Sequence, residues 1–232
     1  MQKQHASPPN EMVLSYRQIR RAVGILGLVL APGLILINYF FGHCAQIQDS
    51  ISHYYYTVAG SLLVGVLCAV GLFLYTYRGF DKWDRWSSNF AAICAFGVAF
   101  SPCNMSPACI KCDVLCYLDN SLRNGIHYGS AVSLFVTLAL MALFLFTKTD
   151  KEHPGPRKRA RNTIYRTCGI IMIIAMVGML GLLNADFQKF MGRAALFVLE
   201  TVALSAFGIS WLVKGETLLK DKNQTDNGKT TR

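Results

Sequence analysis

Residues 194–213 read AALFVLETVALSAFGISWLV, and Glu200 is the only charged side chain in this block. An α-helix needs about 20 apolar residues to cross a hydrocarbon core about 30 Å thick. Inside that core every backbone N–H and C=O must be hydrogen-bonded within the segment, and a helix achieves this. The block therefore predicts a transmembrane helix that carries one carboxyl group.

Five more apolar blocks precede this one along the chain. They span residues 22–41, 57–77, 87–105, 127–147 and 167–184. Of the 232 residues, 53% are hydrophobic and 16% are charged, whereas soluble domains carry about 25% charged residues. Long apolar blocks without amphipathic periods exclude a soluble fold, and the lack of short alternating strands excludes a β-barrel. We predict an all-α membrane protein, a bundle of six transmembrane helices.

The Lys and Arg residues lie mainly in alternate segments between the blocks. Nineteen of them lie in four segments, which are those before the first block and after the second, fourth and sixth blocks. The three segments after the first, third and fifth blocks hold the other 4. The segments richer in Lys and Arg face the cytoplasm. We therefore predict a cytoplasmic N-terminal segment (residues 1–21), a transmembrane domain (22–213) and a cytoplasmic tail (214–232), with mobile termini at residues 1–15 and 220–232. The net charge of +10 then reflects orientation, which excludes nucleic acid as a partner.

Four cysteines lie close together in the third loop, which joins the third and fourth blocks. The charge pattern places this loop outside the cytoplasm. They are Cys103, Cys109, Cys112 and Cys116, and Cys44 is on the same side. Thiols outside the cytoplasm tend to oxidise, so we predict disulfides in this loop. The four cysteines allow three pairings. A metal site and free or redox-active thiols are the alternatives.

A carboxyl group in an apolar helix usually faces the bundle interior and has a partner there. Glu200 lies near the outer end of its block, on the same side as Asp49, Ser52, His53 and His127. We predict that Glu200 points inward and meets His53, His127 or a hydroxyl group. The five residues are candidates for a ligand site, and the alternatives are a purely structural hydrogen bond and a metal or haem site.

No phosphate-binding loop, nucleophile elbow, HExxH helix or haem attachment motif occurs in the sequence. We therefore predict no metal and no cofactor. The most economical hypothesis is a non-enzymatic membrane protein with an outward-facing polar pocket for a lipid, a small amphiphile or a partner helix. An intramembrane hydrolase or transferase and a small-solute transporter are the alternatives.

Several segments resemble an uncharacterised bacterial integral membrane protein family, a domain of unknown function. The resemblance rests on SISHYYYT at residues 50–57 and FGISWLVKG at residues 207–215, with shorter segments at residues 77–81, 143–148 and 161–166. More distantly, the chain is similar to the Frag/DRAM/Sfk group of six-helix membrane proteins. The resemblance implies a multi-pass protein of the bacterial cytoplasmic (inner) membrane without an assigned activity.

The chain also resembles alkaline-ceramidase-type intramembrane hydrolases in having Ser, Asp and His near helix ends. Those enzymes carry a His-x-x-x-His pair on a late helix. No histidine follows His153 in this chain, so the zinc site of that family has no counterpart at matching positions.

Overall fold

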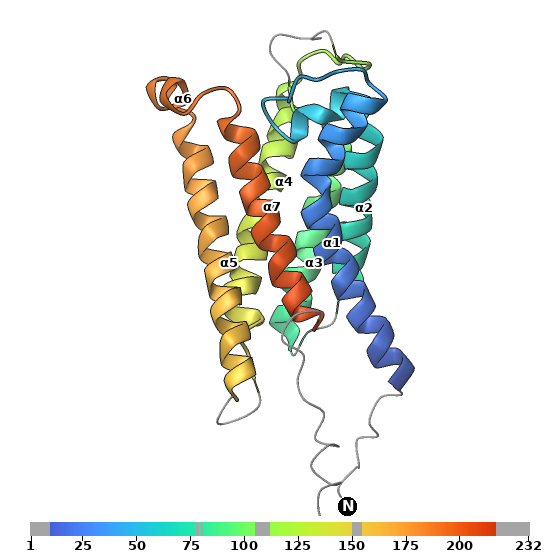
Figure 1. Cartoon of the computed structure of the whole chain (residues 1–232), viewed down its shortest axis with the longest axis vertical. Coiled ribbons are helices and arrows are strands. Elements are labelled where there is room, and N and C mark those ends of the chain that lie inside the picture. The colour runs from blue at the N-terminus through green and yellow to red at the C-terminus, as the bar shows by residue number, and fades with distance from the viewer. Residues whose placement is uncertain (1–9, 78, 80, 105–111, 150–154, 217–232) are drawn as a thin grey trace, which may run out of the picture.

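A computed structural model describes residues 10–77, 79, 81–104, 112–149 and 155–216 (Figure 1). The described residues form helices and no strand. In chain order these are α1 (Asn10–Phe40), the 3-10 helix η1 (Ser52–Tyr56), α2 (Gly60–Thr76), α3 (Lys82–Phe100), α4 (Ser121–Leu140), the π-helical turn η2 (Met141–Leu145), α5 (Pro156–Gly181), α6 (Ala185–Met191) and α7 (Ala195–Lys214).

Four helices are long and apolar enough to cross a membrane. They are α1 from Tyr16 onward, α4 continued by η2, α5 and α7. Helix α2 is apolar but has only 17 residues. Helix α3 is not among the candidate spans, and three of its first four residues are charged. The prediction of an all-helical membrane protein is confirmed at this level.

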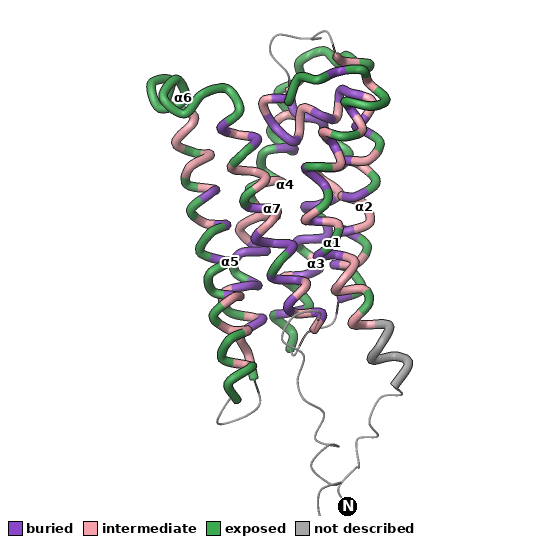
Figure 2. The backbone as a smooth tube through the Cα atoms, viewed as in Figure 1, coloured by how far each residue is buried: buried purple, intermediate pink, exposed green. Residues whose placement is uncertain are grey.

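The long helices run side by side, and the chain passes up and down along the bundle (Figure 1). As a result η1 and α6 lie at one end of the bundle, which we call the η1 end. The start of α1 and the end of α7 lie at the other end, which we call the tail end. Buried residues gather where α1 and α7 meet, whereas much of the outer side of α5 is exposed (Figure 2).

Helices α1 and α7 approach each other closely through two glycines. A Cβ atom added at Gly208 would lie 2.7 Å from the Gly24 carbonyl oxygen, and one added at Gly24 would lie 2.8 Å from the Gly208 carbonyl oxygen. Small residues at such a contact allow helix backbones to pack directly on each other. This seam holds α7, the helix that carries Glu200, against α1.

The helices extend beyond the apolar blocks that predict them. Helix α1 begins at Asn10 and α5 begins at Pro156. Residues 10–15, which the sequence analysis assigns to a mobile terminus, therefore belong to α1, whereas residues 1–9 and 220–232 lie outside the described residues. Polar and basic residues form helix readily, so a helix does not have to end where the apolar residues end. Proline also fits the first position of α5, where its missing N–H has no partner to lose.

Helix α6 is an element that the sequence analysis did not predict. It is short, and it starts after Asn184, whose side-chain oxygen accepts hydrogen bonds from the N–H groups of Asp186 and Phe187. Such capping satisfies backbone donors that a helix start otherwise leaves free. The helix turns the chain between α5 and α7 at the η1 end.

Candidate functional site

Glu200 connects α7 to the segment between α1 and η1. Its two carboxylate oxygens lie 2.9 and 3.0 Å from the Ser50 hydroxyl oxygen, and one of them accepts a hydrogen bond of 2.5 Å from the Ile51 N–H. Glu200 thus points into the bundle, and its side-chain partner is a hydroxyl group and not a histidine. Hydrogen bonds to a carboxylate are stronger than those between neutral groups, and these two join parts of the chain that are 149 residues apart.

Ser52, the first residue of η1, contacts a histidine of α4. The Ser52 hydroxyl oxygen lies 3.0 Å from Nε2 of His127, and Nδ1 of His127 lies 2.7 Å from the Ser101 carbonyl oxygen at the end of α3. A carbonyl oxygen can only accept, so Nδ1 carries the proton. In the neutral ring Nε2 is then the acceptor, and the Ser52 hydroxyl donates to it. His127 is buried, which holds the ring in this orientation.

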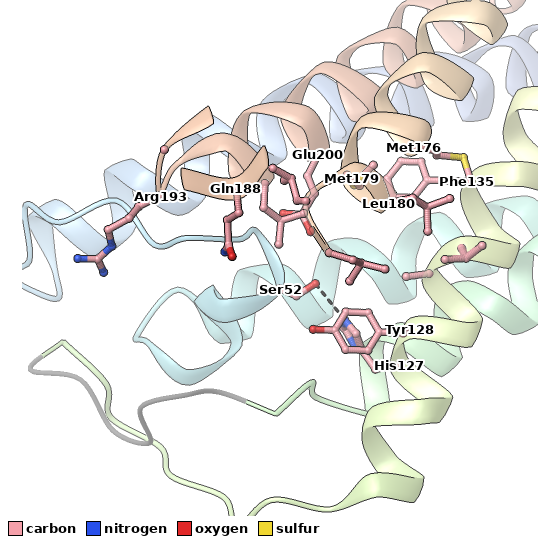
Figure 3. Close-up of a pocket in the computed structure, with 16 residues that line it drawn as sticks. Ser52, His127, Tyr128, Phe135, Met176, Met179, Leu180, Gln188, Arg193 and Glu200 are labelled. Carbon is pink, nitrogen blue, oxygen red and sulfur yellow. Dashed lines mark hydrogen bonds between the residues drawn. The ribbon is translucent and has the colours of Figure 1, made fainter. Parts of the chain in front are cut away.

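A cavity of about 640 Å³ opens between α4, α5 and α7 toward the η1 end (Figure 3). Ser52, His127 and Glu200 line its polar part. The walls are apolar and include Val132, Phe135, Met176, Met179, Leu180 and Leu196. The part of α4 that lines the cavity, from His127 to Phe135, is about 12 Å long at 1.5 Å per residue. The side chains of Gln188 and Arg193 lie at the rim.

Two of the predicted site residues do not line this cavity. The Asp49 carboxylate lies 3.5 Å from the exposed guanidinium of Arg193, and the Asp49 carbonyl accepts from the Phe197 N–H. Burial lowers the pKa of His53 below its ordinary value of 6.5, although the carboxylates of Asp49 and Asp113 act in the opposite direction. His53 is therefore mainly neutral at pH 7. The structure brings Ser52, His127 and Glu200 together and places Asp49 and His53 beside them.

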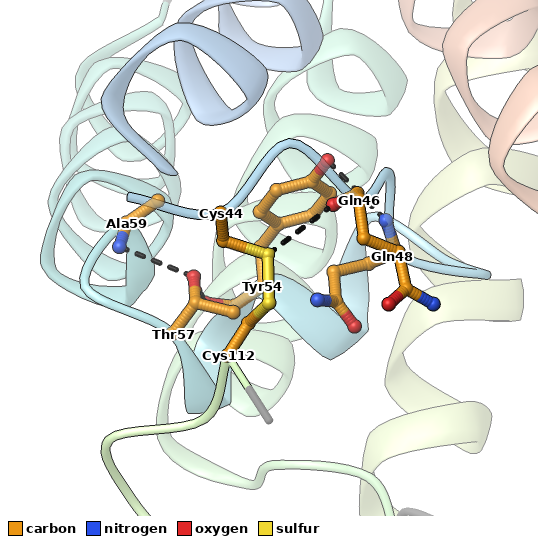
Figure 4. The surroundings of a disulfide bond; sticks show 7 residues. All are labelled: Cys44, Gln46, Gln48, Tyr54, Thr57, Ala59 and Cys112. Atoms are coloured by element: carbon orange, nitrogen blue, oxygen red, sulfur yellow. Dashed lines mark hydrogen bonds between the residues drawn. A yellow bond between two sulfur atoms is a disulfide. The ribbon is translucent and has the colours of Figure 1, made fainter. Parts of the chain in front are cut away.

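The third loop is joined to the first loop by a disulfide between Cys44 and Cys112 (Figure 4). Cys116 is also disulfide-bonded, and Cys109 lies outside the described residues. This confirms that the third loop contains disulfide-bonded cysteines, but the partner of Cys112 is Cys44 of the first loop and not one of the four cysteines that are expected to pair. This link between the third and first loops lies beside Tyr54 of η1 (Figure 4).

Cys103 is the exception among the predicted disulfide cysteines, because it is a free thiol. Only 1% of the residue is exposed, so the side chain is buried in the protein. Burial raises the pKa of the Cys103 thiol to about 12. The thiol is protonated at neutral pH, and a protonated thiol is a poor nucleophile and a poor metal ligand.

Within the part of the chain that the structure describes, no three His, Cys, Asp or Glu side chains come close enough to hold a metal ion. Around Glu200 the described residues thus offer no group of three such metal ligands. The chemistry that these residues offer is hydrogen bonding and proton transfer, with an apolar cavity beside it.

Two partners in this site were missed by the sequence analysis. Ser50 holds the Glu200 carboxylate, and the Ser101 carbonyl orients His127. A serine in a loop and a backbone carbonyl carry no distinctive sequence signal. Comparison with protein-family models, curated proteins and solved structures finds no match for the chain. The resemblance to a bacterial membrane protein family therefore stays a prediction.

Proposed function

We propose that the chain crosses the bacterial inner membrane six times, with both termini in the cytoplasm. Helices α2 and α3 pack against each other, and α3 packs against α4, within the same bundle as the four long apolar helices. If α2 and α3 also cross, every segment at the tail end belongs to the set that holds 19 of the 23 Lys and Arg residues. By the positive-inside rule the tail end then faces the cytoplasm and the η1 end faces outward.

In this orientation the cavity binds a lipid or another small amphiphile with an apolar chain and a polar head. The observation that carries the proposal is the division of the cavity into an apolar wall and a polar end. Binding sites for small molecules are commonly clefts of about 300–1,000 Å³ with mostly apolar walls and a few polar groups that fix orientation. The cavity matches this pattern in size and in composition.

The two parts of the cavity suit the two parts of an amphiphile. A hydrocarbon chain would lie along the inner stretch, between Phe135 on α4 and Met176 on α5. The head would lie at the η1 end, near Ser52 and the rim residues Gln188 and Arg193. The guanidinium of Arg193 is largely exposed and offers several N–H donors to an anionic or carbonyl-bearing head group. Membrane lipids are thus the partners that we propose.

Photo-crosslinking tests this function in the full-length protein in lipid nanodiscs. The probe is palmitic acid that carries a diazirine in the chain and a terminal alkyne. We expect adducts on cavity residues such as Phe135 and Met179. Val132→Trp places an indole in the cavity and should reduce these adducts about tenfold, equivalent to about 1.4 kcal/mol of binding free energy.

The matched control is Val177→Trp. Val177 is exposed on α5 and does not line the cavity, so this variant adds the same bulk on the lipid-facing side. Its adducts should equal those of the wild type. Two results would contradict binding in the cavity. One is a set of adducts spread evenly over lipid-facing residues, and the other is an equal loss of adducts in both variants.

A further inference from the structure

We infer that Ser52 is a nucleophile activated by His127, and that the protein cleaves the ester bond of a long-chain acyl compound held in the cavity. This inference rests on the proposed binding of an amphiphile and names the chemistry of the same site. A weak hydroxyl nucleophile becomes reactive when a base accepts its proton and a third group orients the base. Ser52, His127 and the Ser101 carbonyl are arranged in that order.

The tautomer of the neutral His127 ring follows from its two contacts. The Ser101 carbonyl holds the proton on Nδ1, so the lone pair of Nε2 faces the Ser52 hydroxyl at 3.0 Å. That distance is within the 2.6–3.2 Å over which a general base takes a proton. A backbone carbonyl here does the orienting that a carboxylate does in a Ser-His-Asp triad. Glu200 does not take that part, because it is bound to Ser50 and Ile51.

The position of the pair in the cavity decides the class of substrate. Ser52 lies at the polar end, and the apolar wall continues from it along α4 and α5. A carbonyl carbon beside Ser52 would therefore belong to an acyl group whose chain lies along that wall. The alcohol part of the ester would lie toward the rim with Gln188 and Arg193.

The reaction proceeds in two balanced steps. In the first, the Ser52 oxygen forms a bond to the acyl carbon while its proton moves to Nε2 of His127. The ester C–O bond then breaks, and the leaving alcohol takes that proton, which leaves an acyl group on Ser52. In the second, a water molecule attacks the acyl carbon and gives a proton to Nε2. The Ser52–acyl bond breaks, the carboxylic acid leaves, and the Ser52 oxygen regains the proton from His127.

An alkyl fluorophosphonate with a fluorescent tag tests this inference, because it phosphonylates activated serines. We expect purified wild-type protein in nanodiscs to be labelled, and peptide mass analysis to place the label on Ser52. Ser52→Ala should abolish labelling. Ser61→Ala removes an exposed hydroxyl on α2 outside the cavity and should label like the wild type. His127→Gln should slow labelling by about 10²–10⁴-fold, the usual contribution of a general base.

A second assay uses p-nitrophenyl decanoate as the substrate. Release of p-nitrophenol by the wild type should be lost in Ser52→Ala and retained in Ser61→Ala. The variants are compared by thermal unfolding, so that a loss of fold is separated from a loss of reactivity. If the wild type is unlabelled, or if Ser52→Ala is labelled as fast as the wild type, the inference is wrong and the Ser52–His127 hydrogen bond is only structural.

The failure of this inference is distinguishable from the failure of the proposed function. If the palmitic acid probe still crosslinks to Phe135 and Met179 while the fluorophosphonate does not react at Ser52, binding stands and the covalent step is refuted. If Ser52 reacts but the palmitic acid probe does not enter the cavity, Ser52 is still an activated nucleophile. The proposal that its substrate carries a long acyl chain is then wrong.

Discussion

Glu200→Ala is expected to destabilise the protein strongly, whatever binds in the cavity. The substitution leaves the Ser50 hydroxyl and the Ile51 N–H without the acceptor that both share. A buried donor that loses its partner costs about 1–3 kcal/mol, so the two together predict a loss of several kcal/mol. Thermal unfolding in detergent would measure it, and we expect a midpoint well below that of the wild type.

Glu200→Gln is the matched substitution of the same size. The carboxamide oxygen can accept from the Ile51 N–H, and the amide group can donate to the Ser50 oxygen, so most of the stability should remain. Glu216→Ala is the control for loss of an acidic group in a less buried place, since Glu216 pairs with Arg17 at 3.1 Å near the tail end. Exposed ion pairs contribute at most about 1 kcal/mol. A Glu200→Ala variant as stable as the wild type would remove the structural role of this residue.

Loss of the disulfide between Cys44 and Cys112 is the second large effect that we expect. The bond joins residues that are 68 positions apart. Closing a loop of that length lowers the entropy of the unfolded chain by an amount worth about 4 kcal/mol at 25 °C in the chain-entropy model. Cys44→Ser and Cys112→Ser should each lower the free energy of unfolding by an amount of this order.

The double substitution distinguishes a shared bond from two separate effects. If the two cysteines act only through one bond, the Cys44→Ser, Cys112→Ser variant should be no less stable than either single variant. Cys68→Ser is the control, because Cys68 is a free thiol on α2. Additive losses in the double variant, or a peptide map without the linkage of these two cysteines, would contradict the structure at this end of the bundle.

The sequence predicts the apolar part of the fold well, because the bilayer sets the length of the blocks. The block at residues 194–213 corresponds closely to α7, and the block at residues 22–41 lies within α1 except for its last residue. The ends are predicted less well, since polar residues continue a helix into water without an apolar signal. Helix α6 is too short to produce a periodic pattern, and only the capping residue Asn184 marks its start.

For the candidate site, residue type is more informative than spacing. Glu200 stands out because a carboxyl group inside an apolar block needs a partner, and it has one in Ser50. The direction in which a loop side chain points is not encoded in its spacing. Cys103 belongs to the cysteine group by sequence but turns inward as a free thiol, and Asp49 turns toward Arg193. The pairing of Ser52 with His127 depends on how η1 lies against α4, which only the fold determines.

The central claim of this account is that the site lies at the outer face of a chain that crosses the membrane six times. Reporter fusions in a bacterial host test it directly, because alkaline phosphatase is active only outside the cytoplasm and green fluorescent protein fluoresces only inside it. Fusions after Gln48 and Asp119, at the η1 end, should show phosphatase activity, and a fusion after Gly155 should fluoresce. Phosphatase activity after Gly155 would contradict the account, because the segment with the most positive charges would then lie outside and the predicted alternation would fail.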